Sequence, residues 1–251
     1  MKLNYKLQGN GPAIIFMHGV FGSLDNLNML AKNLLSNYQI VQVDMRNHGF
    51  SPWSDVMNYQ VMAEDIAQLC HNLGLQDVIL IGHSMGGKVA LQLTQIIPDI
   101  IQQIVAIDIA PIQYPIATNA LVLNALTQVV SQSITDKKQI ISIMKNNELT
   151  DATIQFLLKS FKNGQWLFNV DVIVKQYQHL CDWQMISPWL KPTLFIKGGN
   201  SNYITAKDYD EIYLQFPNAK IETVIGAGHN VHAEKTAQVL QILQHWLCHQ
   251  S

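Results

Sequence analysis

Short apolar runs alternate along this chain with longer stretches in which apolar residues recur at helical spacing. The short runs predict strands, at Leu3–Leu7, Ala13–Met17, Gln39–Val43, Val78–Ile81, Ile104–Ile107, Thr193–Lys197 and Ile221–Val224. The longer stretches predict helices, at Leu24–Ser36, Tyr59–Leu73, Met85–Ile97, Lys207–Gln215 and Glu234–Cys248. This alternation is typical of an α/β fold, a mostly parallel sheet with helices on both faces.

One segment breaks the alternation. Between Ile112 and Ile186 we find only helical patterns, at Asn119–Val130, Thr135–Met144, Thr150–Ser160 and Asp171–Leu180. We therefore expect a core built from residues 1–111 and 187–251, interrupted by a helical cap at 112–186. An insertion after a strand lies over the carboxyl edge of the sheet, where active-site lids are common. A helical satellite without a role in binding is the alternative; the lid is favoured because the insertion directly follows Asp108.

Composition narrows the possible partners. The 251 residues are 48% hydrophobic, enough for a sizeable core, and a net charge of −2 disfavours nucleic acid and anionic lipid as partners. Cys70, Cys181 and Cys248 lack the spacing of a metal site or a disulfide framework, which favours a reducing compartment. The first residues form no secretory signal, and no apolar run reaches the roughly 18 residues of a membrane span. We expect a soluble, cytoplasmic protein.

The most informative motif is Gly82-His83-Ser84-Met85-Gly86, between an apolar strand and a helical pattern. In this setting G-x-S-x-G predicts a nucleophile elbow, with Ser84 at the tip of a strained turn at positive φ. Side chains at Gly82 and Gly86 would collide with the neighbouring strand and helix. The stretch up to Lys88 also fits most of a phosphate-binding loop, but Val89 stands where that motif needs Ser or Thr for Mg²⁺.

A serine nucleophile needs a base downstream of it in this kind of fold. His229 ends the glycine-rich segment Gly226-Ala227-Gly228, just after a predicted strand, where a loop can lift an imidazole over the sheet. His232 is the nearest rival. We predict His229 as the base.

The orienting acid is less obvious, because the usual loop after the penultimate strand, residues 197–203, contains no carboxylate. Asp208 is the next one along the chain and lies within a helical pattern. Asp108 instead closes the apolar strand after the one that carries Ser84, and a carboxylate buried there requires a partner. We predict that this partner is His229; capping of a turn at Pro111 is the alternative.

An oxyanion needs two backbone N–H donors. One is expected from Met85, the residue after the nucleophile. The other is expected from the segment His18-Gly19-Val20-Phe21-Gly22, with Val20 as the donor and Phe21 as the alternative. His18 precedes the nucleophile and is expected to be a structural hydrogen-bonding residue.

Together these pieces resemble the α/β-hydrolase superfamily over essentially the whole chain. The motifs in order are His18–Gly22, the D-x-R-x-H-G-x-S loop at Asp44–Ser51, the elbow at Gly82–Gly86 and the segment ending at His229. In the loop, Arg46 and His48 are expected to bond internally, and Asn47 replaces the usual glycine.

A nearer resemblance is to the YbfF-like esterases, whose eukaryotic relatives include the α/β-hydrolase domain 11 proteins. It is carried by Phe21–Asn26, Gly82–Lys88, Val105–Pro111 and Gly198–Ser201. The resemblance places the acid in the D-I-A-P phrase, at Asp108. It implies a capped esterase or thioesterase that acts on small-molecule acyl esters of short to medium chain length, including acyl-CoA thioesters, without metal or cofactor.

Other activities on this fold remain as alternatives. Dehalogenases and epoxide hydrolases need Asp at position 84, so Ser84 disfavours both. A C–C hydrolase or lyase uses the same triad, and a non-catalytic ligand-binding receptor shares the fold. The cap's bulky aromatic residues are candidates for the pocket lining, namely Phe156, Phe161, Trp166, Phe168 and Trp183.

Overall fold

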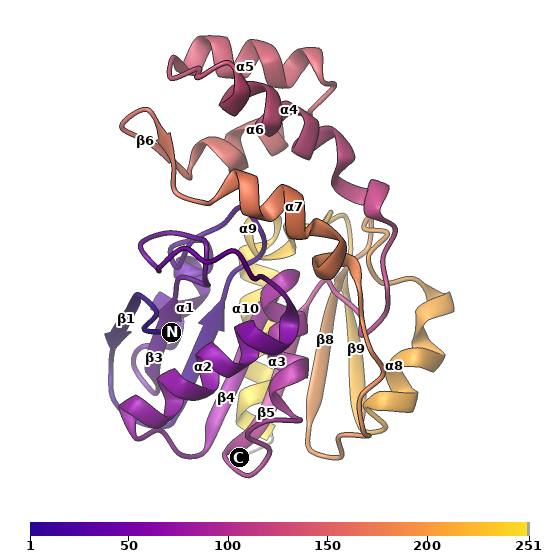
Figure 1. Cartoon of the computed structure of the whole chain (residues 1–251). Helices are drawn as coiled ribbons and strands as arrows, with labels where there is room; N and C mark the ends of the chain where they lie inside the picture. Colours follow the sequence, from indigo (N-terminus) through magenta and orange to yellow (C-terminus); the bar gives the residue numbers. More distant parts are fainter. Residues whose placement is uncertain (250–251) are drawn as a thin grey trace.

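The computed structural model describes residues 1–249 of the chain and contains a central seven-stranded sheet (Figure 1). The strand order is β1-β3-β2-β4-β5-β8-β9; β1 pairs antiparallel with β3 and every other pair is parallel. Their bounds are β1 Tyr5–Gln8, β2 Ala13–Met17, β3 Gln39–Val43, β4 Val78–His83, β5 Ile101–Ile107, β8 Thr193–Gly198 and β9 Ala219–Val224. The predicted α/β class is confirmed.

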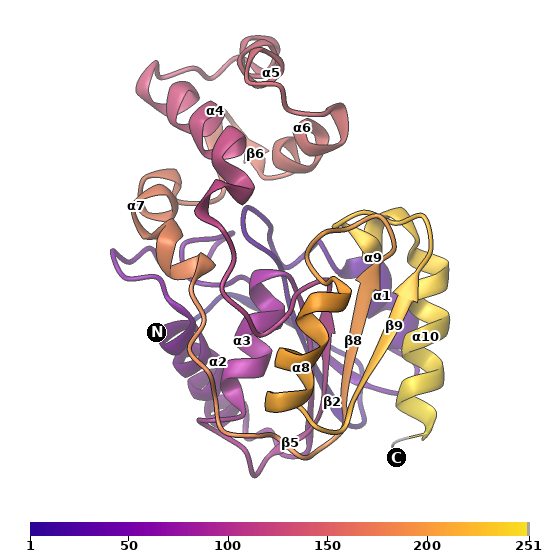
Figure 2. The same ribbon diagram turned by 90° about the vertical axis from the view of Figure 1, so that its right-hand side faces the viewer.

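Helices cover both faces of this sheet (Figure 2). On one face lie α1 (Asn28–Leu34) and α10 (Thr236–His249), whose apolar residues share a core cluster with β2 and β4. On the other face lie α2 (Tyr59–Leu73), α3 (Met85–Leu93) and α8 (Tyr209–Gln215). Because β4 has a helix layer on each side, all six of its residues are buried, as the continuous apolar run requires.

Most of the segment between β5 and β8, residues 116–181, lies beyond the carboxyl ends of the strands, above the sheet edge, and the chain then returns along the side of the core to β8 (Figures 1 and 2). Its helix α7 lies nearest the core. The elements are η1 Ile116–Asn119, α4 Ala120–Ser131, α5 Lys137–Asn146, α6 Asp151–Leu158, the paired strands β6 Phe161–Lys162 and β7 Gln165–Trp166, and α7 Val170–Cys181.

The expectation of helices alone in this segment is wrong in one place, the β6–β7 hairpin. Asn163 and Gly164 form its turn, both at positive φ (51° and 78°). Asn-Gly between two strands is the strongest local hairpin signal, since both turn positions need left-handed backbone. The helix expected over 150–160 accordingly ends at Leu158.

Other elements differ from expectation mainly at their ends. Residues 24–27 form turns, so α1 begins at Asn28, and α3 ends at Leu93, four residues before the predicted end. The predicted final helix, Glu234–Cys248, corresponds to α10, which begins two residues later, and it is preceded by a short helix that was not predicted, α9 (Val231–Glu234). No helix within residues 1–249 is both long and apolar enough to cross a bilayer.

Candidate active site

Ser84 occupies the sharp turn between β4 and α3, with φ 51° and ψ −118°. A Cβ at Gly82 would lie 2.2 Å from the carbonyl oxygen of Gly86, and one at Gly86 would lie 2.2 Å from that of Met17. Both glycines are therefore required for the backbone to pass this closely. The expected positive φ at Ser84 and the lack of room beside it are confirmed.

The structure brings Ser84, His229 and Asp108 together from three separate elements. His229 Nε2 lies 3.0 Å from Ser84 Oγ, and His229 Nδ1 lies 2.7 Å from Asp108 Oδ2. Asp108 follows β5 with φ 51° and is completely buried, whereas His229 stands in the loop after β9. The same arrangement of serine, histidine and carboxylate recurs in acyl-transfer enzymes, where the three act as nucleophile, base and orienting acid.

The loop after β8 holds the Asp108 carboxylate with donors. The Gly198 N–H donates to Asp108 Oδ1 at 2.8 Å, and the Ser201 hydroxyl donates to Oδ2. A Cβ at Gly198 would lie 2.3 Å from the Gly228 carbonyl oxygen, so this glycine allows the Asp108-binding loop to approach the loop that carries His229. Sequence reasoning missed both donors; a polar Gly-Gly-Asn-Ser segment without a carboxylate was the available signal.

Two further residues hold His229 in place, one at its ring and one at its backbone. The Tyr203 ring stacks on it, with centroids 3.7 Å apart and 15° between the planes. His83 Nε2 donates to the His229 carbonyl oxygen at 2.9 Å. Burial, followed by the neighbouring His232 and His229, holds the pKa of His83 well below its usual value, so this ring is neutral at neutral pH. No local pattern of residues marks either contact.

His232, the rival base, packs edge-on against His83 instead of meeting the nucleophile. The two ring centroids are 4.4 Å apart, and burial lowers the pKa of His232 to about 4. Asp208, the rival acid, accepts hydrogen bonds from the Thr205 N–H and hydroxyl and so caps the start of η2 (Ala206–Asp208). Neither rival contacts Ser84.

Of the candidate oxyanion donors, Phe21 is already engaged, since its N–H donates to His48 Nε2 at 3.1 Å. Among the described residues, the Val20 N–H has no hydrogen-bond acceptor. Met85 is the first residue of α3, so its N–H has no acceptor within the helix. Val20, Met85 and Ser84 line one small cavity. The geometry favours Val20 over Phe21.

The two early histidines are structural. His18 Nε2 accepts from the Met45 N–H at 3.0 Å, and burial lowers its pKa to about 4. His48 donates through Nδ1 to the Arg46 carbonyl oxygen at 2.9 Å, and burial lowers its pKa to about 3. Arg46 departs from expectation, because its guanidinium leaves the loop and pairs with Asp65 of α2 at 2.7 Å.

Two cavities meet at Ser84. The larger, of about 390 Å³, opens beneath the cap; the smaller, of about 30 Å³, lies between Met85 and α7. Among the aromatic candidates for the lining, Phe156 lines the larger cavity. Phe161, Trp166 and Phe168 stack on one another, and Trp183 packs against Tyr59. Within residues 1–249, no cluster of three or more His, Cys, Asp or Glu side chains is arranged to hold a metal ion.

Comparison with known proteins agrees with this architecture. The model of the α/β hydrolase fold family matches residues 12–133. Esterase YbfF of Escherichia coli (strain K12) is 43% identical over 252 residues, covering 98% of this chain and 99% of that protein. The sn-1-specific diacylglycerol lipase ABHD11 of Xenopus laevis is 35% identical over 245 residues, covering 93% of this chain and 78% of that protein.

Among solved structures, a marine microorganism esterase superposes with a TM-score of 0.91 at 33% identity, covering 97% of this chain and 98% of its own. The similarity thus extends over both the sheet and the cap, in sequence and in structure. The chain belongs to the α/β-hydrolase fold family, as a YbfF-like member whose relatives include esterases and lipases.

Proposed function

We propose that this protein is a serine hydrolase that cleaves carboxylic esters, and acyl thioesters such as acyl-CoA, through an acyl-enzyme. The observation that carries the proposal is the hydrogen-bonded chain from Ser84 through His229 to the buried Asp108, at the floor of a 390 Å³ cavity. A serine hydroxyl is a weak nucleophile at neutral pH, and this arrangement supplies the base that activates it.

In the first step Ser84 Oγ attacks the acyl carbon and its proton passes to His229 Nε2, 3.0 Å away. Asp108 accepts the Nδ1–H bond, which keeps Nε2 free as the base and stabilises the imidazolium that forms. Because Gly198 and Ser201 also donate to the carboxylate, Asp108 is held in one orientation.

The tetrahedral oxyanion is assigned to the N–H groups of Met85 and Val20. Donors of this kind act where charge develops, and removal of one typically costs about 3–4 kcal/mol of transition-state stabilisation. The Met85 donor also lies at the N-terminus of α3, where the helix dipole favours negative charge.

Collapse of this intermediate breaks the bond to the alcohol oxygen or thiol sulfur, and His229 returns its proton to that atom. Water then enters and attacks the acyl-enzyme with His229 again as base. This second attack releases the acid and restores Ser84. Apart from the substrate and this water, the sequence of steps uses side chains and N–H groups of the chain itself.

The test compares wild type with Ser84→Ala on p-nitrophenyl esters from acetate to longer acyl chains. Without the nucleophile, turnover is expected to fall by a factor of about 10⁶, as for other serine triads. The variant is expected to keep its circular dichroism spectrum and melting temperature, since it removes one small hydroxyl. Near-wild-type turnover by Ser84→Ala, or a folded wild type inactive on every ester, would contradict the proposal.

A further inference from the structure

The two cavities that meet at Ser84 differ in how they lie relative to the base. The larger is lined by His229, Asn230 and His83 together with residues of the cap. The smaller is lined by Met85, Ile109 and Leu180, among others, and His229 is not part of its wall. His229 therefore lies within reach of a group bound in the larger cavity, and it is not part of the wall of the smaller one.

We propose that the small cavity is the acyl pocket and restricts the substrate to esters or thioesters of very short acids, acetyl or propionyl, whereas the large cavity receives a bulky alcohol or thiol. This inference rests on the proposed function. It adds a direction of substrate binding and a substrate class to it.

The chemistry of acyl transfer assigns the two cavities. The tetrahedral carbon carries the serine oxygen, the oxyanion, the leaving group and the acyl substituent. The leaving group must accept a proton from His229 Nε2, so it lies within reach of that atom, in the larger cavity. The oxyanion points to the N–H groups of Met85 and Val20. These two residues also line the small cavity, so the oxyanion lies on the side of that cavity next to the nucleophile. The acyl substituent takes the remaining direction, past the oxyanion toward Ile109 and Leu180.

The size of the small cavity limits the acyl chain. A space of roughly 10–15 Å³ accepts one water molecule, so a volume of about 30 Å³ holds one or two carbon atoms beyond the carbonyl. The large cavity offers about 390 Å³, which suits an aromatic alcohol or the proximal part of a long thiol.

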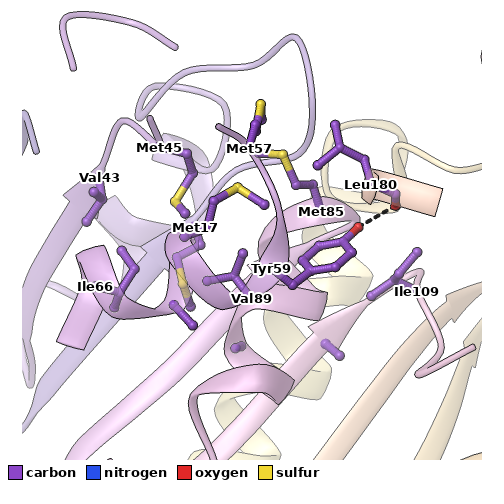
Figure 3. Packing of buried hydrophobic residues seen from close by; sticks show 14 of the residues in the cluster. Met17, Val43, Met45, Met57, Tyr59, Ile66, Met85, Val89, Ile109 and Leu180 are labelled. Atoms are coloured by element: carbon purple, nitrogen blue, oxygen red, sulfur yellow. Dashed lines mark hydrogen bonds between the residues drawn. The ribbon is translucent and has the colours of Figure 1, made fainter. Parts of the chain in front are cut away.

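The wall of the small cavity is aromatic, and its phenol groups are already occupied. Tyr59 donates to the Leu180 carbonyl oxygen at 2.6 Å, as Figure 3 shows, and Tyr114 donates to the Tyr203 carbonyl oxygen at 2.6 Å. The Tyr177 hydroxyl accepts from the Asn119 side chain. With these hydroxyls engaged, the rings present apolar surface, which favours a methyl or ethyl group over a polar one.

Lys88, one helical turn after the nucleophile, contacts the residues that form this wall. Its ammonium lies 5.1 Å from the centroid of the Tyr59 ring and 4.8 Å from that of Tyr114. It also donates to the carbonyl oxygens of Cys181 and Asp182, at 3.3 and 3.2 Å, where α7 ends. These contacts oppose widening of the pocket for a longer chain.

The experiment measures kcat/KM on two ester series with purified wild-type protein. In p-nitrophenyl esters of increasing acyl length, we expect a maximum at acetate or propionate and a fall of at least about 10-fold by hexanoate. In acetates of alcohols from ethanol to 1-naphthol, we expect no penalty for the larger alcohol. An acyl optimum at hexanoate or longer would overturn the proposal.

Two matched variants separate the cavities. Leu180→Ala enlarges only the small cavity and is expected to move the acyl optimum by two or more carbons. Leu157→Ala makes the same change in the wall of the large cavity and is expected to leave the acyl optimum unchanged. Leu180→Val is the milder second variant if Leu180→Ala melts too early to assay.

The opposite assignment of the variants, with Leu157→Ala moving the acyl optimum and Leu180→Val without effect, would also overturn the proposal. Absence of turnover on every ester, together with no acylation of Ser84 in a mass measurement, would instead count against the proposed function itself. The two failures are thereby distinguished.

Discussion

The sheet edge and the cap hold the two halves of the site with different kinds of contact. At the sheet edge, Ser84 and Asp108 are kept at positive φ, and the carboxylate is surrounded by short hydrogen bonds. In the cap, the walls of the cavities combine apolar side chains such as Leu157 and Leu180 with polar ones such as Asn119. The sheet edge fixes the positions of the candidate catalytic atoms, and the cap determines the shape of the cavities that would receive the substrate.

The cap is also joined to the core at both ends of α7. Before the helix, the Asn169 N–H donates to the Asn47 carbonyl oxygen at 2.9 Å, and the Gly49 N–H donates to that of Leu167. After it, Lys88 and Tyr59 bind the final carbonyls. Substitutions at the sheet edge should therefore change the catalytic rate by orders of magnitude, whereas substitutions in the cap should change substrate choice and stability.

The largest effect after loss of Ser84 is expected from Asp108→Asn. An amide keeps the shape of the carboxylate but cannot stabilise an imidazolium, and it favours the wrong tautomer of His229. In a triad of another fold, the same change lowers kcat by about 10⁴. We expect a loss of about 10³–10⁴ in kcat, measured on p-nitrophenyl acetate.

Asp208→Asn is the matched control, since it makes the same chemical change in a residue that caps η2. We expect activity within a few-fold of wild type and a modest loss of stability, typical of a weakened cap. A larger loss of kcat in Asp208→Asn than in Asp108→Asn would identify Asp208 as the acid. It would also contradict the assignment of the rate-determining residues to the sheet edge.

The candidate catalytic residues could be predicted from the sequence, whereas most contacts that hold them in place could not. Ser84, Asp108 and His229 were found because each follows an apolar strand, and the first and last lie among glycines, which are local signals. Their roles remain predictions, but their meeting at one point is a property of the structure. The donors to Asp108 could not be found this way, because Gly198 lies 90 residues along the chain.

Contacts between distant loops also explain the other misses. The Phe21 N–H is taken by His48, 27 residues away, and Arg46 pairs with Asp65 in the following helix, so no local pattern marks either contact. The cap hairpin is different. Its Asn163-Gly164 turn was visible in the sequence but was outweighed by the surrounding helical periodicity. The division of the chain into core and cap domains remains a prediction.

A second prediction concerns acid stability, which we expect to be set by the sheet edge. Burial lowers the pKa of His18 and His232 to about 4, that of His48 to about 3, and that of His83 well below its usual value. In the unfolded chain these groups bind protons near pH 6.5, before the folded protein does. The free energy of unfolding therefore falls as pH drops from about 6.5 toward 4, by on the order of 3 kcal/mol for His18 alone.

Urea unfolding between pH 4 and 8 checks this window. His232→Phe keeps a ring against His83 but removes one titrating group, so its stability should fall less steeply with acid than that of wild type. A free energy of unfolding that stays level from pH 6.5 to 4 in wild type would mean that these histidines are not held neutral. Equal slopes in the two proteins would exclude His232 from the effect.

The smallest expected effect belongs to Lys88, where the two regions meet. Burial lowers the pKa of this side chain from 10.5 to about 7, since its hydrogen bonds go to neutral carbonyls. Between pH 7 and 10.5 the unfolded chain therefore binds the additional proton, and this group makes the free energy of unfolding rise with pH. One proton contributes at most about 1.4 kcal/mol per pH unit. Lys88→Met should lose that rise, as measured by urea unfolding at pH 7, 8 and 9.

The same variant decides what the buried ammonium does. Replacing an unpaired buried charge by an apolar side chain of similar length is often neutral or stabilising, so Lys88→Met should be at least as stable as wild type at pH 7. A broader acyl-chain preference of this variant, with kcat on p-nitrophenyl acetate changed only a few-fold, would show that Lys88 acts on the shape of the small cavity and not on the acyl-transfer steps. A loss of kcat comparable to that of Asp108→Asn would instead mean that Lys88 contributes to catalysis, as the residues of the sheet edge do. In that case α3 beyond the nucleophile would belong with the residues that set the rate and not with those that shape the cavity.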